Sequence, residues 1–158
     1  MTKLLKILPL TLLLTACAST FGDQAQNAIT YQEALQSPSA ALGKTIIVGG
    51  PIISYNQTAN GTQIEIANAP LNDQDAPSIR GNMSERVIIN IADHIPAEQL
   101  QNVRISAIGS ITDMAEMTRY GNTKIIMITA TQHRIWRTTK PMFDPNNKER
   151  YGYTYKVE

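Results

Sequence analysis

The residue best suited to covalent chemistry is the single cysteine, Cys17. It ends an apolar stretch that begins at Ile7, and Leu14, Thr15 and Ala16 stand directly before it. The thiolate is the nucleophilic form of cysteine, and small residues before it let the chain enter a peptidase cleft. A single thiol excludes an intramolecular disulfide and a zinc site built from several cysteines.

The residues before Cys17 have the organisation of an export signal. Lys3 and Lys6 precede the apolar run, which is far shorter than the ~20 residues of a transmembrane helix. The four residues that end at Cys17 resemble the lipobox of bacterial lipoproteins, and all four positions fit. The resemblance implies a diacylglyceryl group on the Cys17 sulfur, acylation of its new amino terminus, and removal of residues 1–16 as a signal peptide. Because stable anchoring needs more than one acyl chain, the multiply acylated Cys17 makes the membrane an expected partner.

The charge balance limits the class of partner, and the residue after Cys17 indicates the cellular location. The chain of 158 residues has 14 basic and 13 acidic residues, and loss of Lys3 and Lys6 leaves 12 and 13. This near balance argues against a nucleic-acid partner, which is usually held by a large positive field. Ala18 stands where an Asp retains many enteric lipoproteins at the inner membrane. The class resemblance therefore implies the outer membrane, with the domain facing the periplasm.

Strand signals dominate the chain after residue 44. We expect strands over residues 44–55, 62–69, 86–92, 103–111 and 124–137. Gly49-Gly50-Pro51 indicates a bulge or bend in the first strand, and Asn60-Gly61 indicates a hairpin turn. Thr30 followed by Glu33 is a capping-box pattern that predicts a short helix over 31–36.

The order of the elements favours one architecture. Three strands, a short helical connection over residues 93–101 and two more strands are typical of an all-β, OB-like barrel with five strands, partly open, and one or two short helices. A small sandwich is the competing arrangement. We expect a flexible tether over residues 17–29, the barrel domain over 30–140 and a polar C-terminal tail over 141–158.

Several short motifs, in their order and spacing, resemble the Slp family of outer-membrane lipoproteins. They are Leu42-Gly43-Lys44, Val48-Gly49-Gly50, Thr62-Gln63-Ile64-Glu65-Ile66, Pro70-Leu71, Ile108-Gly109-Ser110-Ile111 and Arg134-Ile135-Trp136. With the lipobox, the resemblance covers about residues 30–137. It implies an envelope lipoprotein linked to starvation or stress, with no established catalytic residues to carry over.

The residues with metal-binding potential do not form a ligand set in the sequence. His94 and His133 are the two histidines of the chain, whereas a catalytic zinc site needs about three protein ligands. Asp73 and Asp75 begin a calcium-loop pattern, but the Gly and the later Glu of such a loop do not follow. Because nucleophile-elbow, dinucleotide and P-loop motifs are also missing, we expect no metal, no cofactor and no catalytic residues.

A late cluster of basic and aromatic residues is the candidate contact surface for a ligand or partner. It comprises Tyr120, Arg134, Trp136 and Arg137. Such residues on an OB-like sheet suit phosphate-bearing ligands, but the pattern favours an ordinary solvated face with Trp136 buried at the barrel end. The prediction is a non-enzymatic binding or scaffolding module with an envelope protein, lipid or glycan as partner. The alternative is an enzyme, or an enzyme accessory, that acts on cell-wall glycan or envelope lipid.

Overall fold

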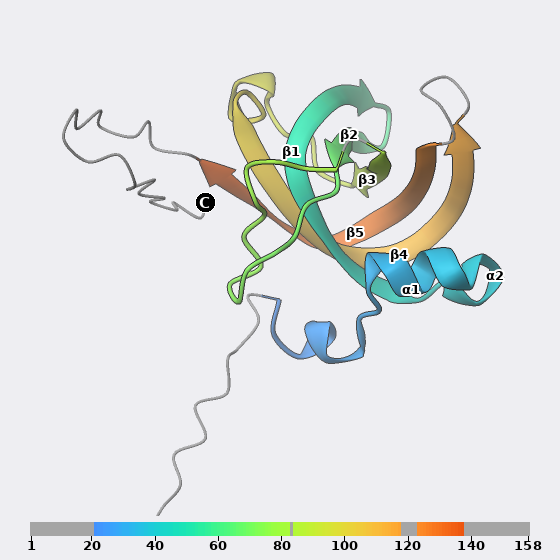
Figure 1. Ribbon diagram of the computed structural model, residues 1–158. Helices are drawn as coiled ribbons and strands as arrows, with labels where there is room; N and C mark the ends of the chain where they lie inside the picture. Colours follow the sequence, from blue (N-terminus) through green and yellow to red (C-terminus); the bar gives the residue numbers. More distant parts are fainter. Residues whose placement is uncertain (1–20, 83, 118–122, 138–158) are drawn as a thin grey trace, which may run out of the picture.

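Five strands close into a barrel in the computed structural model, which describes residues 21–82, 84–117 and 123–137 (Figure 1). The strands are β1 (Thr45–Thr58), β2 (Gly61–Ala67), β3 (Glu85–Ile91), β4 (Val103–Met117) and β5 (Thr123–Arg137). They follow the order β1-β2-β3-β5-β4 around the barrel, and β4 pairs back to β1. All neighbours are antiparallel except β3 and β5, which are parallel. The predicted OB-like, five-stranded all-β fold is confirmed.

The barrel is closed, whereas the order of the elements in the sequence predicted a partly open one. The barrel is closed by β1, which pairs with two neighbouring strands along its length. Its first half, Thr45–Pro51, pairs with β4, and its second half pairs with β2 from Ile52 onward. The register with β2 shifts between Ile52 and Ser54, next to the bend that the sequence predicted. A strand that turns at this point can join both edges of a five-stranded sheet.

The two glycines of β1 are required by close packing. A methyl group on Gly50 would overlap the carbonyl oxygen of Ala67. A methyl group on Gly49 would lie 2.8 Å from Leu71 Cδ2 and 2.9 Å from Pro77 Cγ. Gly50 therefore lets the end of β2 approach β1 closely, and Gly49 lets the β2–β3 connection cross β1 without a side chain between them. Packing within the chain therefore accounts for both glycines.

The interior of the barrel is filled by branched aliphatic side chains. Those with an exposed fraction below 2% include Ile46, Val48, Ile64, Ile66, Val87, Ile89, Ile105, Ile111, Ile126 and Ile128. In β2 and β3 these residues recur at every second position, which points them to one face of the sheet. Burial of each such side chain stabilises the fold by about 1.5–3 kcal/mol relative to exposure. The barrel is held by this core.

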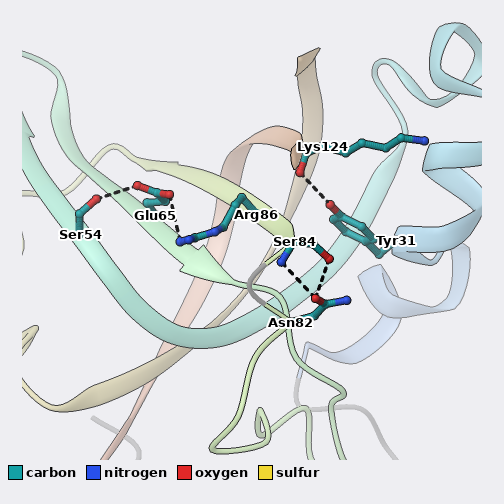
Figure 2. Close-up of polar contacts among 7 residues, drawn as sticks. All are labelled: Tyr31, Ser54, Glu65, Asn82, Ser84, Arg86 and Lys124. Carbon is teal, nitrogen blue, oxygen red and sulfur yellow. Dashed lines mark hydrogen bonds and ion pairs between the residues drawn. The ribbon is translucent and has the colours of Figure 1, made fainter. Parts of the chain in front are cut away.

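Two short helices lie at one end of the barrel, α1 (Tyr31–Gln36) and α2 (Pro38–Ala41) (Figure 1). The predicted capping box is confirmed, because Glu33 N–H donates to Thr30 Oγ1 at 3.2 Å and Thr30 N–H donates to Glu33 Oε2 at 2.7 Å. Hydrogen bonds from the Thr30 backbone and side chain hold the pKa of the Glu33 carboxyl below its usual value. Tyr31 docks α1, since its hydroxyl donates to the Lys124 carbonyl at 3.2 Å (Figure 2).

The other end of the barrel is covered by the connection between β3 and β4, which contains η2 (Ala97–Gln99). Ile95 and Leu100 are 5% and 2% exposed and join the core. Ile95 N–H donates to Thr62 Oγ1 at 2.8 Å, and Gln57 Nε2 donates to the Ile95 carbonyl at 2.8 Å. The connection is thereby fixed to the β1–β2 hairpin.

An N-terminal segment packs on the outside of the barrel, which corrects the tether expected through residue 29. Residues 22–27 form a 3-10 helix, η1 (Gly22–Asn27), and Phe21 before it is 3% exposed. Ile29 N–H donates to the Thr45 carbonyl at 2.8 Å and forms a parallel bridge with Ile46. The small polar residues suggested a linker, but the two apolar residues that flank η1 find partners on the barrel.

A polar cluster lies on the outer face of β1, β2 and β3. Glu65 accepts a hydrogen bond from Ser54 Oγ at 2.9 Å and pairs with Arg86 Nη1 at 3.2 Å (Figure 2). Ion pairs of this partly exposed kind contribute about 0–1 kcal/mol. The cluster aligns the three strands, while the core supplies most of the stability.

Several sequence expectations fall outside the described residues. They are the signal peptide over residues 1–16, the lipidation site at Cys17, the contact residue Tyr120 and the tail over 141–158. Within the described ranges, none of the helices is long and apolar enough to cross a membrane.

We predict that Gly50→Ala lowers the free energy of unfolding by about 1–3 kcal/mol, because the added methyl forces the backbone away from Ala67. Asn56→Ala, at an exposed position of the same strand, is the matched control and should change stability by less than about 0.5 kcal/mol. Urea denaturation followed by circular dichroism measures both. Equal stability of the two variants would contradict the role given to Gly50.

Candidate functional site

A hollow of about 340 Å³ opens at the barrel end opposite α1, and we call it the mouth hollow. It is lined by Asp93, His94, Ile95, Pro96, Gln99, His133, Ile135 and Arg137. Its size lies at the lower end of the range of small-molecule sites. The barrel interior is filled, and this surface hollow brings two histidines, a carboxylate and a guanidinium to one open space.

The parallel pairing of β3 and β5 brings the two walls of the hollow together. Parallel strands end on the same side of a sheet, and the pairing of these two continues only to Asn90 and Thr129. Beyond that point β5 stays paired with β4, while the chain after β3 turns across the barrel end. Residues 93–99 form one wall and residues 133–137 form the other. The two histidines of the chain therefore meet at one site.

The hydrogen bonds of Gln57 determine where the lone pair of His94 lies. Gln57 Nε2 donates to the Ile95 carbonyl, so Gln57 Oε1 is the atom that lies 3.1 Å from His94 Nδ1. An amide oxygen only accepts, and His94 Nδ1 must therefore carry the hydrogen. In the neutral ring this leaves the lone pair on Nε2. His94 is thus held in one tautomer, with Nε2 left as an acceptor or, after protonation, a donor.

His133 is half-buried on the facing wall. Burial lowers the pKa of its imidazole below the ordinary value of 6.5, and the nearby carboxylate of Asp93 partly opposes this shift. The ring is therefore neutral at pH 7. An additional negative charge placed beside this imidazole favours its protonated form and so raises its pKa.

The fixed charges of the hollow are Asp93 and Arg137. No ion pair joins these two side chains in the part of the chain that the structure describes. In the part of the chain that the structure describes, no group of three or more His, Cys, Asp or Glu is arranged to hold a metal ion. The arrangement is suited to hydrogen bonding and charge recognition.

Comparison with known families decides the identity of the chain. The model of the outer membrane lipoprotein Slp family matches residues 14–157, which is nearly the whole chain. The chain belongs to the Slp family. Searches of curated proteins and of solved structures gave no match. The resemblance found in the sequence is thus confirmed, and the protein is an outer-membrane lipoprotein.

The structure separates the expected contact residues of this Slp-family protein. Trp136 is 2% exposed, and its indole N–H donates to Ser106 Oγ at 2.8 Å. Arg134, two residues earlier on the same face of β5, lies with its guanidinium carbon 6.0 Å from the ring centroid of Phe21. Arg137 lines the mouth hollow together with His133. Alternation along the strand therefore places Trp136 in a packed layer and Arg137 in the hollow.

Sequence reasoning missed the meeting of Asp93, His94 and His133. The three residues follow β3 or lie near the end of β5, and these strands are distant in the chain. The usable signal was the strand order of the OB-like barrel, in which these two strands are parallel and end together. Of the expected contact residues that the structure describes, Arg137 lines the hollow, whereas Arg134 and Trp136 lie on the other face of β5.

The lowered pKa of His133 makes stability depend on pH. The folded state binds this proton less readily than the unfolded state, so the free energy of unfolding should fall as pH decreases below about 6.5. His133→Gln removes the titrating group and should reduce this slope. Urea midpoints of the wild type and the variant, measured between about pH 8 and pH 5, test it, because all other groups titrate in both proteins. Identical slopes would rule out the assignment.

Proposed function

We propose that this Slp-family protein is a non-enzymatic binding or scaffolding module, held at the periplasmic face of the outer membrane by lipid on Cys17 and used under starvation or stress. The mouth hollow carries the proposal. Because the barrel interior is filled, a ligand or partner must bind at the surface. The hollow on this surface combines two imidazoles, a carboxylate and a guanidinium. The stress link and the absence of catalysis come from the family resemblance.

The lipid anchor is supported by the residues around Cys17. The region that matches the family begins at Leu14, the first residue of the lipobox, and so includes Ala16 and Cys17. The thiol is the only group in the chain that could form the thioether. Several acyl chains on one residue give stable membrane attachment.

The packing of Phe21 sets how far the barrel can lie from this anchor. Phe21 is buried on the barrel and follows Cys17 by four residues, which span at most about 14 Å even when fully extended. The barrel is therefore held close to the lipid headgroups. Arg134, which contacts Phe21, belongs to the strand end whose other face lines the mouth hollow. A module held in this way works beside the membrane surface.

We predict that Cys17→Ser abolishes incorporation of labelled fatty acid and moves the protein out of the outer-membrane fraction, because a hydroxyl does not form the thioether. Ser19→Ala alters a neighbouring residue outside the lipobox and should retain both the label and the location. Metabolic labelling and membrane fractionation measure the two effects. Retained label in Cys17→Ser would contradict the anchor.

The orientation has its own test. Protease added to intact cells should leave the wild-type chain uncut, and the same protease should cut it after the outer membrane is permeabilised. Cleavage in intact cells would place the domain on the outer surface and overturn the proposed periplasmic location.

A further inference from the structure

We propose that the mouth hollow is a binding site for an oxyanion, a phosphate or carboxylate group, which Arg137 holds by charge and His94 and His133 hold as hydrogen-bond donors. This inference rests on the proposed binding function and names the chemistry of its ligand. The site is built from two chain segments that the parallel pairing of β3 and β5 brings together.

The donors of the hollow match an oxyanion. The Arg137 guanidinium presents several N–H groups in a planar fork, which fits two oxygens of a phosphate or carboxylate. His94 is oriented by Gln57 through Nδ1, so its Nε2 is the nitrogen left for a ligand. His133 adds a second imidazole from the facing wall. A hollow of about 340 Å³ has room for such a group with part of the molecule that carries it.

The charges that face the hollow determine its pH dependence. Asp93 and His94 come from the connection after β3, and His133 and Arg137 come from β5. With the His133 imidazole neutral, Asp93 offsets Arg137 and attraction for an anion is weak. Protonation of His133 adds positive charge to the hollow, and a bound oxyanion in turn stabilises the protonated ring. Binding should therefore strengthen as pH falls.

Two sources of the oxyanion are compatible with the geometry, a soluble ion and a lipid headgroup. Arg137 lies three residues beyond Arg134 on β5, a distance of about 10 Å along a strand. Arg134 contacts Phe21, which is itself tied closely to Cys17. The hollow is thus within a short distance of the anchored surface, and the phosphate chemistry is the same for both sources.

The test is a titration of the full chain carrying Cys17→Ser, which follows the imidazole ¹⁵N and ¹H resonances by NMR. Since the chain has two histidines, His94→Gln and His133→Gln assign the signals. Inorganic phosphate at about pH 6 should shift both imidazoles saturably, and the affinity at about pH 8 should be lower. Phosphate carries more charge at the higher pH, so tighter binding at the lower pH must come from protonation of the protein.

Arg137→Gln should weaken phosphate binding by about tenfold or more, the size expected for a charged hydrogen bond. Arg80→Gln is the matched control, because it removes an exposed guanidinium from the loop between β2 and β3 and should leave the affinity unchanged. An equal loss in both variants would indicate nonspecific attraction and overturn the site. Shifts that persist unchanged in Arg137→Gln would overturn it as well.

Vesicles of phosphatidylglycerol distinguish the two sources. A response of both imidazoles to these vesicles as well as to phosphate supports the site with a headgroup as ligand, and a response to phosphate alone supports it with a soluble ion. No saturable response to phosphate, acetate or vesicles at about pH 6 overturns the inference. That failure leaves the anchor and the module intact, since labelling of Cys17 and fractionation report on them separately.

Discussion

The close approach of Gly50 to the carbonyl of Ala67 is the constraint on which the rest of the structure depends. It lets β1 leave β4 and join β2 without ending the strand, and this closes the barrel. Closure fixes β5 between β3 and β4, parallel to β3. The ends of β3 and β5 then diverge at the same end of the barrel and form the walls of the mouth hollow. A site of widely separated residues thus depends on the strand order of the closed barrel.

The sequence predicted the elements whose signals are local. The alternation of Thr62–Ala67 identified β2, and the pair Thr30 and Glu33 identified the start of α1. It predicted β4 only to Ile111, because residues 112–117 lack alternation and become a strand by pairing with β5. The mouth hollow could not be predicted locally either, since His94 and His133 meet through parallel pairing. Trp136 was grouped with Arg137, which strand alternation places on the other face of β5.

The family match describes the membrane attachment of this protein, and the packing describes its barrel. The Slp family match establishes an outer-membrane lipoprotein, and the isoleucine-rich interior establishes a rigid barrel without an internal ligand chamber in the described residues. The burial of Phe21 relates the barrel to the membrane anchor, because it leaves few residues between the barrel and Cys17. In the proposed arrangement the mouth hollow is carried at a restricted distance from the membrane. Its imidazoles and charged side chains are then accessible to envelope proteins, lipids or glycans near the membrane.

The most direct test of the central claim, that contact chemistry lies at the mouth hollow, is photo-cross-linking in intact cells. A photoreactive side chain introduced at Gln99 lies in the hollow, and the same group at Asn56 is exposed on the face of β1 opposite to Gln57, the residue that bonds to His94. Mass spectrometry of the adducts identifies a protein, lipid or glycan. The account predicts one dominant class of adduct from Gln99 and none above background from Asn56. Equal adducts from both positions, or adducts from Asn56 alone, would contradict it.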